Sequence, residues 1–422
     1  MTSLSTIETS PAPPPSPAPE RRTLRRIVIT MGAIALVVAM VGGGWLYATT
    51  QVDTASAAGT FLRSVPKLTV TSDPADGAVD VRPDATVTVT ARYGRIVAAQ
   101  LLDDTDASST GVVAPDGTAW SSAGSALATG STYRVNLQID TPRGVKNHVT
   151  SFTTLTPVAT VSARVSPGDD ETVGVGQPIS VRFSDPVGDK AAVERSLSVT
   201  ASTPVVGSWH WFSDMEVHYR PQQFWPANIT VDVAANLAGV DFGNGVWGDR
   251  NITTHFNIGN ANVSTVDLQT YRMIVTTNGQ QVADIPISGG KDGFPTMTGT
   301  LLVLNKAAHV VMDSSTNGIP LDSADGYRTD VDWATRLTNT GIYVHAAPWS
   351  VGSQGSANVS HGCINVSDEW GKWFYDLSQP GDPVTITGGP RPPSSTDAGS
   401  RDWNMSWDEW IAGSALAGLP IS

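Results

Sequence analysis

Cys363 is the only cysteine among the 422 residues of the chain, and its surroundings suit covalent chemistry. It lies in the run Ser360–Asn365, whose sequence is SHGCIN, four residues before Ser367. Ser367 is a typical N-cap, and the positive end of the helix dipole that follows is expected to lower the pKa of the thiol and enrich the nucleophilic thiolate. Gly362 lets backbone N–H groups approach a reacting carbonyl, so the amides of Gly362 and Cys363 are a predicted oxyanion hole.

Two histidines could accept the proton of that thiol. His361 is two residues from Cys363, and in an extended strand both side chains would point the same way. His345 lies on a separate apolar run, Ile342–Ala346, and would reach the thiol only through tertiary folding. The spacing leaves this choice open. It also leaves open a structural interpretation, in which Cys363 is a buried, inert side chain and His345 is a hydrogen-bonded core residue.

Short strands and turns must position these groups. The chain has 40 glycines and 28 prolines, and only 15% of its residues are charged, which is typical of turn-rich β domains. Alternating runs such as Thr86–Thr90 and Ile179–Phe183, separated by Gly, Pro and Asp turns, predict two immunoglobulin-like β-sandwiches. A third segment contains a predicted hairpin turn at Asn278 and Gly279 and a helix that begins after Ser367.

The predicted fold class is therefore mainly β, with an N-terminal transmembrane helix, two immunoglobulin-like sandwiches, a β-rich catalytic domain with few helices, and a C-terminal helical cap rich in tryptophan. In the cap, Ser406 and Glu409 have the spacing of a capping box, and the tryptophans are expected to pack against the body of the protein. The predicted boundaries are 1–26 for a disordered cytoplasmic tail, 27–47 for the transmembrane anchor, 48–66 for a linker, 67–155 and 156–260 for the two sandwiches, 261–387 for the catalytic domain, and 388–422 for a linker and the cap.

The membrane prediction depends on residues 27–47, which carry no charge over 21 positions. A helix of that length spans about 30 Å, the thickness of a bilayer core. Four arginines lie between positions 21 and 26, which places the tail in the cytoplasm and the catalytic domain on the extracytoplasmic side of the cell membrane. A cleaved signal peptide is the alternative, because Ala55–Ala57 resembles a cleavage site.

Charge and cysteine content exclude several classes of function. The net charge is −13, and no basic stripe follows residue 30, so nucleic acid is not an expected partner. A single cysteine excludes an intrachain disulfide framework and a cysteine-based zinc site. One oxygen-rich turn, with Asp241, Asn244 and Gly245, is a candidate Ca²⁺ site, although an ordinary Asx turn is the alternative. No metal or cofactor is required by the expected chemistry.

The pattern of His345, fourteen intervening residues and then Ser360–Asn365 resembles the signature of the L,D-transpeptidases, which cross-link peptidoglycan with a YkuD-type catalytic domain. The likeness continues through Met312–Ser315, Gly326–Trp333 and Ala347–Ser350, and through the terminal Trp-rich helix. An anchor followed by two immunoglobulin-like modules is similar to the mycobacterial and related actinobacterial members of that family.

This resemblance implies roles for individual residues. It implies that Cys363 is the nucleophile and His345 its base, oriented by the backbone carbonyl of Ala346 at a position where the most similar members have serine. It also implies that the amides of Gly362 and Cys363 hold the oxyanion and that a lid spans roughly residues 309–333. The remaining site residues implied by the resemblance are His361 and Asn365, which shape the site, Tyr327 in the lid, Thr340 and Gly341 on a donor-binding strand, and Met312, Trp349 and Ser360 as further substrate contacts.

The reaction implied by the resemblance has two halves. Cys363 attacks the amide between the L-centre of meso-diaminopimelate and the D-alanine of a tetrapeptide stem, D-alanine leaves, and an amine of a neighbouring stem attacks the thioester to give a 3→3 bridge. The lid would keep water away from the thioester. The implied partners are peptidoglycan stem peptides and the cell membrane, and carbapenems are implied to acylate the same cysteine.

Two other functions are compatible with some of these features. A cysteine hydrolase of wall peptides, similar to an L,D-carboxypeptidase, would use the same thiol, although papain-like enzymes place Cys before His in the chain, and sortases are similar only in the general order. A non-catalytic, wall-binding adhesin built from sandwich modules would not need Cys363 at all. Product analysis separates the first alternative from cross-linking, and replacement of Cys363 separates the second.

Overall fold

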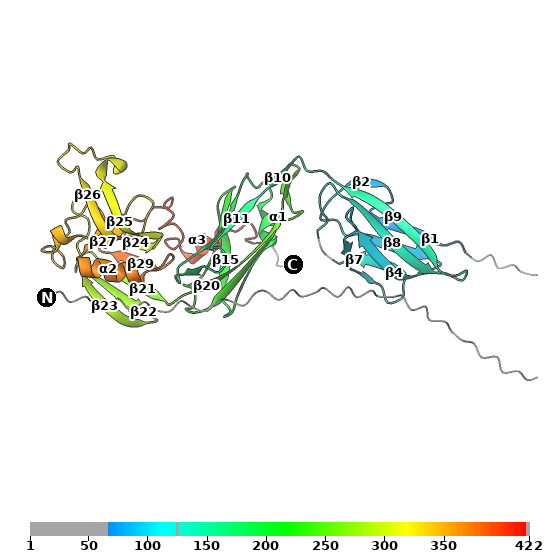
Figure 1. Ribbon diagram of the computed structural model, residues 1–422, viewed down its shortest axis with the longest axis horizontal. Helices are drawn as coiled ribbons and strands as arrows, with labels where there is room; N and C mark the ends of the chain where they lie inside the picture. Colours follow the sequence, from blue (N-terminus) through cyan, green and yellow to red (C-terminus); the bar gives the residue numbers. More distant parts are fainter. Residues whose placement is uncertain (1–65, 124–125, 419–422) are drawn as a thin grey trace, which may run out of the picture. The chain divides into compact units, whose positions relative to one another are not determined.

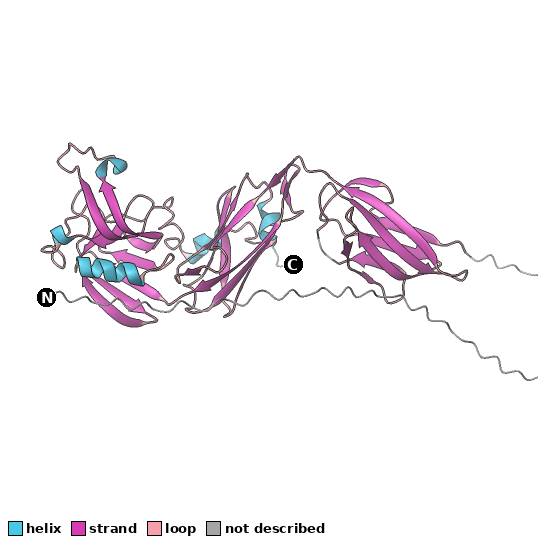
Figure 2. Cartoon of the chain, in the orientation of Figure 1, coloured by secondary structure: helices cyan, strands magenta, loops and turns pink. Residues whose placement is uncertain are grey.

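The computed structural model describes residues 66–123 and 126–418, and strands predominate in these ranges (Figures 1 and 2). The mainly β fold class predicted from the sequence is confirmed for them. The predicted tail at 1–26 and the predicted anchor at 27–47 lie outside the described residues. Within the described ranges, no helix is both long and apolar enough to cross a membrane. The membrane anchor therefore stays a prediction.

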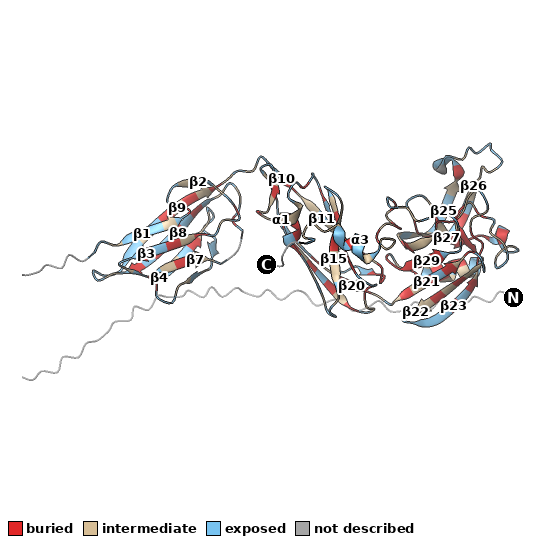
Figure 3. Cartoon of the chain, turned by 180° about the vertical axis from the view of Figure 1, so that it is seen from behind, coloured by how far each residue is buried: buried red, intermediate tan, exposed pale blue. Residues whose placement is uncertain are grey.

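Residues 69–154 form two sheets that pack face to face, with orders β1-β3-β7-β6 and β2-β9-β8-β4-β5. Every second side chain of β8 is buried, as a strand with one solvated face requires, and Figure 3 shows this alternation. Trp120, Val135 and Phe152 lie in the core between the sheets. The strands are β1 (Thr69–Asp73), β2 (Ala78–Val81), β3 (Thr88–Arg92), β4 (Arg95–Leu102), β5 (Ser108–Ser109), β6 (Gly111–Val113), β7 (Ala119–Ser122), β8 (Thr132–Asp140) and β9 (Lys146–Thr154).

Residues 159–258 form a second sandwich, with sheet orders β11-β13-β16-β15 and β12-β20-β17-β14 and a small third sheet, β10-β19-β18. Its core contains Ile179, Val181, Val231 and Phe256. The elements are β10 (Ala159–Val161), β11 (Ala163–Ser166), β12 (Thr172–Val173), β13 (Ile179–Phe183), α1 (Lys190–Arg195), β14 (Leu197–Ala201), β15 (Gly207–Ser213), β16 (Glu216–Pro221), β17 (Thr230–Asn236), β18 (Asp241–Gly243), β19 (Val246–Gly248) and β20 (Asn251–Ile258).

Residues 262–387 contain two further sheets, ordered β23-β22-β21-β29-β24 and β25-β26-β27-β28. The predicted hairpin turn joins β22 to β23, with Asn278 and Gly279 both at positive φ, as a type I′ turn requires. The strands are β21 (Asn262–Asp267), β22 (Arg272–Thr277), β23 (Gln280–Pro286), β24 (Gly299–Leu302), β25 (Asn305–Asp313), β26 (Arg328–Arg336), β27 (Tyr343–Ala346), β28 (Ile364–Val366) and β29 (Pro383–Thr387), with 3₁₀ turns η1 (Ser314–Asn317) and η2 (Pro348–Ser350).

Helix α2 (Asp368–Leu377) covers the β26 and β27 strands of the second of these sheets. It begins as the sequence predicts, because the side chain of Ser367 accepts a hydrogen bond from the backbone N–H of Trp370. Phe374 is fully buried in the core, and Trp370 and Trp373 pack against it. This packing fixes the back of β27, the strand that carries His345.

The C-terminal segment after β29 ends in helix α3 (Trp407–Ala412), which packs on β15 of the second sandwich. Both hydrogen bonds of the Ser406–Glu409 capping box are present. Trp410 is fully buried, and its indole N–H donates to the carbonyl of Ser208 at 2.9 Å. Trp403 donates to the carbonyl of Gly176 at 2.6 Å. The terminal tryptophans therefore have a packing role, and none of them lines the cavity that contains Cys363.

Candidate active site

One cavity of about 420 Å³ contains both predicted chemical groups, the thiol of Cys363 and the imidazole of His345. The sequence-predicted residues Thr340 and Gly341 line a neighbouring cavity of about 220 Å³, which shares Met312 and Tyr327 with the first. Folding therefore brings the predicted site residues into two adjoining spaces. The first cavity is lined by Met312, Tyr327, Thr329, Val331, His345, Trp349, Ser350, Ser353, Val359, Ser360, His361, Cys363 and Asn365.

Two parallel strands place the base next to the nucleophile. In the register of β27 and β28, Val344 lies opposite Ile364 and His345 opposite Asn365. Val344 and Ile364 are fully buried in the core. Because side chains alternate along a strand, His345 and Asn365 face the other side, where the cavity lies. Cys363 immediately precedes β28, so the thiol reaches the same side.

His345 is buried and makes one hydrogen bond that fixes its tautomer. Its Nδ1 lies 2.7 Å from the carbonyl oxygen of Ala346, so Nδ1–H is the donor and Nε2 is left as the basic atom. This is the main-chain contact that the resemblance implies, and it does not need the serine hydroxyl of other members. Burial lowers the pKa of His345 to about 4, so the ring is neutral and able to accept a proton near pH 7.

The thiol of Cys363 is a neutral group in this structure. Burial raises the pKa of Cys363 to about 11, and a hydrogen bond from the backbone of Tyr343 opposes this only in part. The thiol donates to the carbonyl of Gly341 at 3.6 Å. The expectation of a lowered thiol pKa is therefore wrong, because desolvation outweighs the dipole of a helix that begins only after β28. Since both partners are neutral, the proton must move to His345 as sulfur attacks.

One of the two amides of the predicted oxyanion hole, that of Gly362, donates a hydrogen bond within a local turn. Gly362 has φ +124°, and its N–H donates to the side-chain oxygen of Ser360 at 3.0 Å. The hydroxyl of Ser360 in turn donates to the carbonyl of Cys363 at 2.6 Å. Hydroxyl groups commonly accept from an amide two residues ahead in such turns. In this structure the Gly362 amide therefore donates to Ser360, and the oxyanion role of the Gly362 and Cys363 amides stays a prediction.

His361 belongs to the wall of the cavity. Its ring centroid lies 4.8 Å from that of Phe294 and 4.9 Å from that of Tyr327, and its Nε2 is 3.6 Å from a carboxylate oxygen of Asp325. Burial and the nearby ammonium of Lys291 lower the pKa of His361. Its ring is therefore held between two aromatic rings, and its Nε2 is directed at Asp325.

Several residues of the site were not predicted from the sequence. Ser350 accepts a hydrogen bond from the side chain of the predicted residue Asn365 at 3.1 Å, and Ser288 pairs with the backbone of Asn365. Lys291 and Phe294 contact the loop of Cys363 from a segment some 70 residues earlier in the chain. The segment that contains Lys291 and Phe294 has no local pattern typical of catalysis. Only the approach of these two residues to His361 in the folded chain indicates a role.

The β25–β26 hairpin forms the outer wall of both cavities and corresponds to the lid implied by the resemblance. Its tip comprises η1 and the loop that leads to Tyr327, which is half-buried. Trp349 lines the same cavity, is 58% exposed, and has its ring centroid 6.1 Å from that of His345. A peptide in the cavity could therefore contact both a tyrosine and a tryptophan.

The candidate calcium turn gives no sign of a metal site. A side-chain oxygen of Asp241 accepts a hydrogen bond from the N–H of Gly243 at 2.7 Å, as in an ordinary Asx turn. Asn244 and Gly245 follow at positive φ. Within residues 66–123 and 126–418, no group of three His, Cys, Asp or Glu side chains is placed to hold a metal ion.

Comparisons with known proteins match both the sandwich region and the region that contains the site. A family model for a bacterial Ig domain matches residues 78–241, and one for an L,D-transpeptidase catalytic domain matches residues 261–386. The chain is 42% identical to L,D-transpeptidase 2 of Mycobacterium tuberculosis over 84% of this chain and 86% of that relative. It is 38% identical to L,D-transpeptidase 1 of the same species, over 54% of this chain and 84% of the relative. A solved L,D-transpeptidase in complex with imipenem is 38% identical with a TM-score of 0.48, over 55% of this chain and 100% of that one.

Proposed function

The chain belongs to the L,D-transpeptidase family and is a peptidoglycan L,D-transpeptidase, and we propose that it forms 3→3 cross-links through a thioester on Cys363. One observation carries the proposal. The only thiol of the chain and a buried imidazole with a basic Nε2 line the same peptide-sized cavity. Neither a papain-like chain order nor a bound metal is needed for this pair to transfer an acyl group.

In the first half-reaction, sulfur attacks the carbonyl carbon of the L-centre of the donor diamino acid. Nε2 of His345 takes the thiol proton as the carbon–sulfur bond forms, and the negative oxygen is bound by the Cys363 amide. The carbon–nitrogen bond then breaks, and His345 gives its proton to the departing amine of D-alanine. Because the pKa of His345 is about 4, its protonated form is a strong acid toward that amine.

In the second half-reaction, an amine of a neighbouring stem attacks the thioester. The amine reacts in its neutral form, and Nε2 of His345 takes one proton from its nitrogen as the new carbon–nitrogen bond forms. The carbon–sulfur bond then breaks, and His345 returns that proton to sulfur, which regenerates the thiol. Water competes with the amine, so the outcome depends on how well the hairpin of β25 and β26 covers the thioester. The donor stem is proposed to be a tetrapeptide with meso-diaminopimelate, lying along Thr340 and Gly341.

Product analysis tests cross-linking against hydrolysis. Incubation of the protein with a soluble disaccharide–tetrapeptide should release D-alanine and yield a dimer whose mass equals two monomers minus one D-alanine, because the acceptor amine replaces water at the thioester. Liquid chromatography with mass spectrometry measures both products. Release of D-alanine with no dimer, at acceptor concentrations in the millimolar range, would instead support the cysteine hydrolase.

Carbapenem acylation and membrane anchoring are further parts of the proposal. A strained β-lactam carbonyl can be attacked by the same thiol, which supports covalent inhibition at Cys363.

The charge-free run at 27–47, preceded by four arginines, supports a single-pass anchor with the catalytic domain on the extracytoplasmic side of the cell membrane. Recovery of the full-length chain in the membrane fraction after a carbonate wash supports the anchor, and its complete release into the wash would refute it.

A further inference from the structure

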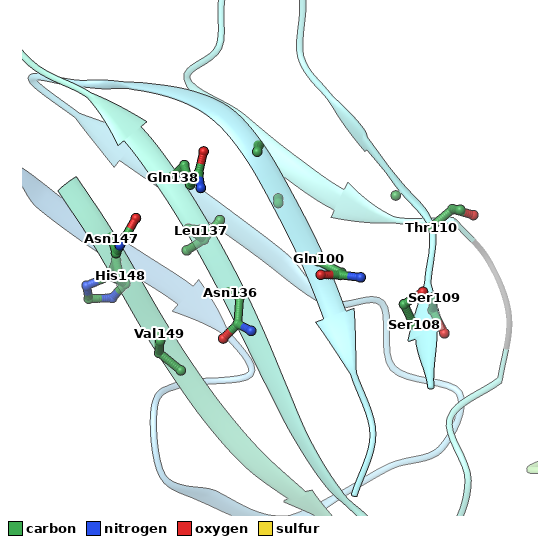
Figure 4. Close-up of a pocket in the computed structure, with 13 residues that line it drawn as sticks. Gln100, Ser108, Ser109, Thr110, Asn136, Leu137, Gln138, Asn147, His148 and Val149 are labelled. Carbon is green, nitrogen blue, oxygen red and sulfur yellow. The ribbon is translucent and has the colours of Figure 1, made fainter. Parts of the chain in front are cut away.

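The first sandwich carries an open groove of about 680 Å³ on the outer face of its five-stranded sheet, with lining residues from β4, β5, β8 and β9 (Figure 4). The alternation of β8 explains its surface. Val135, Leu137 and Ile139 point into the core, and Asn136 and Gln138 between them are exposed. The groove is larger than the cavity of Cys363, and its lining holds no nucleophilic thiol, carboxylate or ammonium group.

Strand register arranges carboxamides in the groove as a small grid. Gln100 on β4 lies opposite Asn136 on β8, and Gln138 on β8 lies opposite Asn147 on β9. The four amide side chains are therefore spread over three neighbouring strands. Neighbouring strands are about 4.8 Å apart, and residues two positions apart on a strand are separated by about 7 Å. All four carboxamide side chains are exposed. The hydroxyl of Ser109 lies beside the grid, where β5 pairs with β4.

We propose that this groove binds the glycan strand of peptidoglycan. A carboxamide offers donors and an acceptor without a charge, which complements the hydroxyl and acetamido groups of neutral N-acetylated sugars. The lining has no Lys, Arg, Asp or Glu side chain to select a charged ligand, and its one histidine is His148. The choice of glycan rests on the proposed function, because the stem peptides that the site joins are attached to such strands.

Binding of a glycan strand to the groove would raise the local concentration of stem peptides near the catalytic domain. The lining holds no Phe, Tyr or Trp side chain, so each contact is expected to be weak. A polymer offers many equivalent sugars, however, and a chain that remains associated with one strand meets its stems repeatedly. The catalytic domain would then not need tight affinity for the peptide alone.

Co-sedimentation with insoluble chitin, an N-acetylated glycan without peptides, tests the groove. We expect the protein to sediment with chitin and the double variant Asn136→Ala, Gln138→Ala to lose at least fivefold of the bound fraction. Gln280→Ala, Gln281→Ala is the matched control, because both glutamines are exposed on β23 of another sheet. Dimer formation from soluble stems should be unchanged in every variant.

No sedimentation of the parent protein, equal binding by the groove variant, or equal loss in the control would each overturn the glycan site. Chitin binding that persists in a protein without dimer-forming activity would instead separate the two proposals. The groove would then stand, and the proposed cross-linking would fail.

An independent observation concerns the lid. Asp325, in the loop that returns to β26, lies 2.6 Å from the ammonium of Lys291 and 3.6 Å from Nε2 of His361. Within the described ranges, these are the only polar contacts between the lid tip, residues 314–327, and residues outside the β25–β26 hairpin. Tyr327 adds one ring contact with His361.

We infer that Asp325 and Lys291 are positioning residues that hold the lid over the thioester. The backbone N–H of Lys291 donates to the carbonyl of Ser360 at 2.9 Å, so its ammonium is attached to the loop that carries Cys363. Opening of the lid tip must separate this ion pair, and closure restores it. The pair therefore favours the state in which water is excluded, and it acts on transfer against hydrolysis rather than on attack by sulfur.

The ratio of dimer formation to hydrolysis at fixed acceptor concentration measures this role. Both side chains of the pair are partly exposed, so Asp325→Asn or Lys291→Met should lower the ratio about two- to fivefold. The double variant should be no worse than either single variant, and the charge swap Lys291→Asp, Asp325→Lys should restore much of the ratio. High salt should lower the ratio in the parent protein and have little effect in the variants.

The ion pair of Arg272 and Asp284, on β22 and β23, is exposed to a similar extent and is the matched control. Arg272→Met, Asp284→Asn should leave the ratio unchanged. An unchanged ratio in the Asp325 and Lys291 variants, additive losses in the double variant, or the same loss in the control would overturn the lid assignment.

Discussion

Replacing Cys363 with alanine should abolish every covalent adduct of the protein. Intact-mass spectrometry after incubation with a carbapenem should show one adduct on the parent chain and none on Cys363→Ala. The expected effect is complete because the chain has no second thiol to take over the reaction. Release of D-alanine from a tetrapeptide donor should fall to the uncatalysed background for the same reason.

The control for this variant is its fold. The substitution removes a thiol hydrogen bond to Gly341 and little buried volume, so the free energy of unfolding should change by only about 1 kcal/mol. Thermal unfolding followed by circular dichroism measures this. An adduct that persists on a folded Cys363→Ala protein would identify another nucleophile, with Ser360 the nearest hydroxyl, and would contradict the proposed mechanism. An unchanged cellular phenotype after Cys363→Ala would instead support the adhesin interpretation.

Local signals predict the parts of the fold that depend on neighbouring residues. The turn at Asn278 and Gly279 needs two residues that tolerate positive φ, and the start of α2 needs a hydroxyl at Ser367. The catalytic pair was predicted in a different way. Spacing left the choice between His345 and His361 open, and a family resemblance favoured His345, whose contact with Ala346 the structure then supplies.

Features of the site that depend on desolvation or on distant segments of the chain were not predicted. The sequence shows the helix dipole near Cys363 but not how much protein surrounds the sulfur, so the direction of the pKa shift was wrong. The use of the Gly362 amide depends on one rotamer of Ser360. The contact of Lys291 with Asp325 joins residues 34 positions apart, and nothing local to either residue marks it.

The docking of the C-terminal segment on the second sandwich is another feature that no local sequence pattern predicts. Asp402 lies 2.6 Å from Nδ1 of His218, and Arg401 pairs with Glu216 at 2.7 Å. Although burial opposes it, the carboxylates of Asp402 and Glu216 raise the pKa of His218. These contacts span more than 180 residues of sequence. They attach the segment that follows β29 to the second sandwich, so the sandwich is part of the support of the catalytic domain.

Replacement of His345 by glutamine should lower the rate of D-alanine release about 10²- to 10⁴-fold, the usual contribution of a positioned base. The glutamine amide can still donate to the carbonyl of Ala346, so the strand should keep its geometry. His361→Gln, which changes a ring in the cavity wall, is the matched control and should cause only a partial loss. Loss of less than tenfold in His345→Gln would contradict its assignment as the base.

The pH dependence of the same rate gives a sharper test. Nε2 of His345 accepts a proton only while the ring is neutral, and its pKa is about 4, so the rate of the parent protein should be flat from about pH 5 to pH 8 and fall below pH 4. His345→Gln depends on thiolate formed without a base. Because the pKa of Cys363 is about 11, its rate should rise about tenfold per pH unit between pH 7 and pH 10. A parent profile with its midpoint near pH 6.5, or a variant profile without that rise, would mean that another group takes the proton.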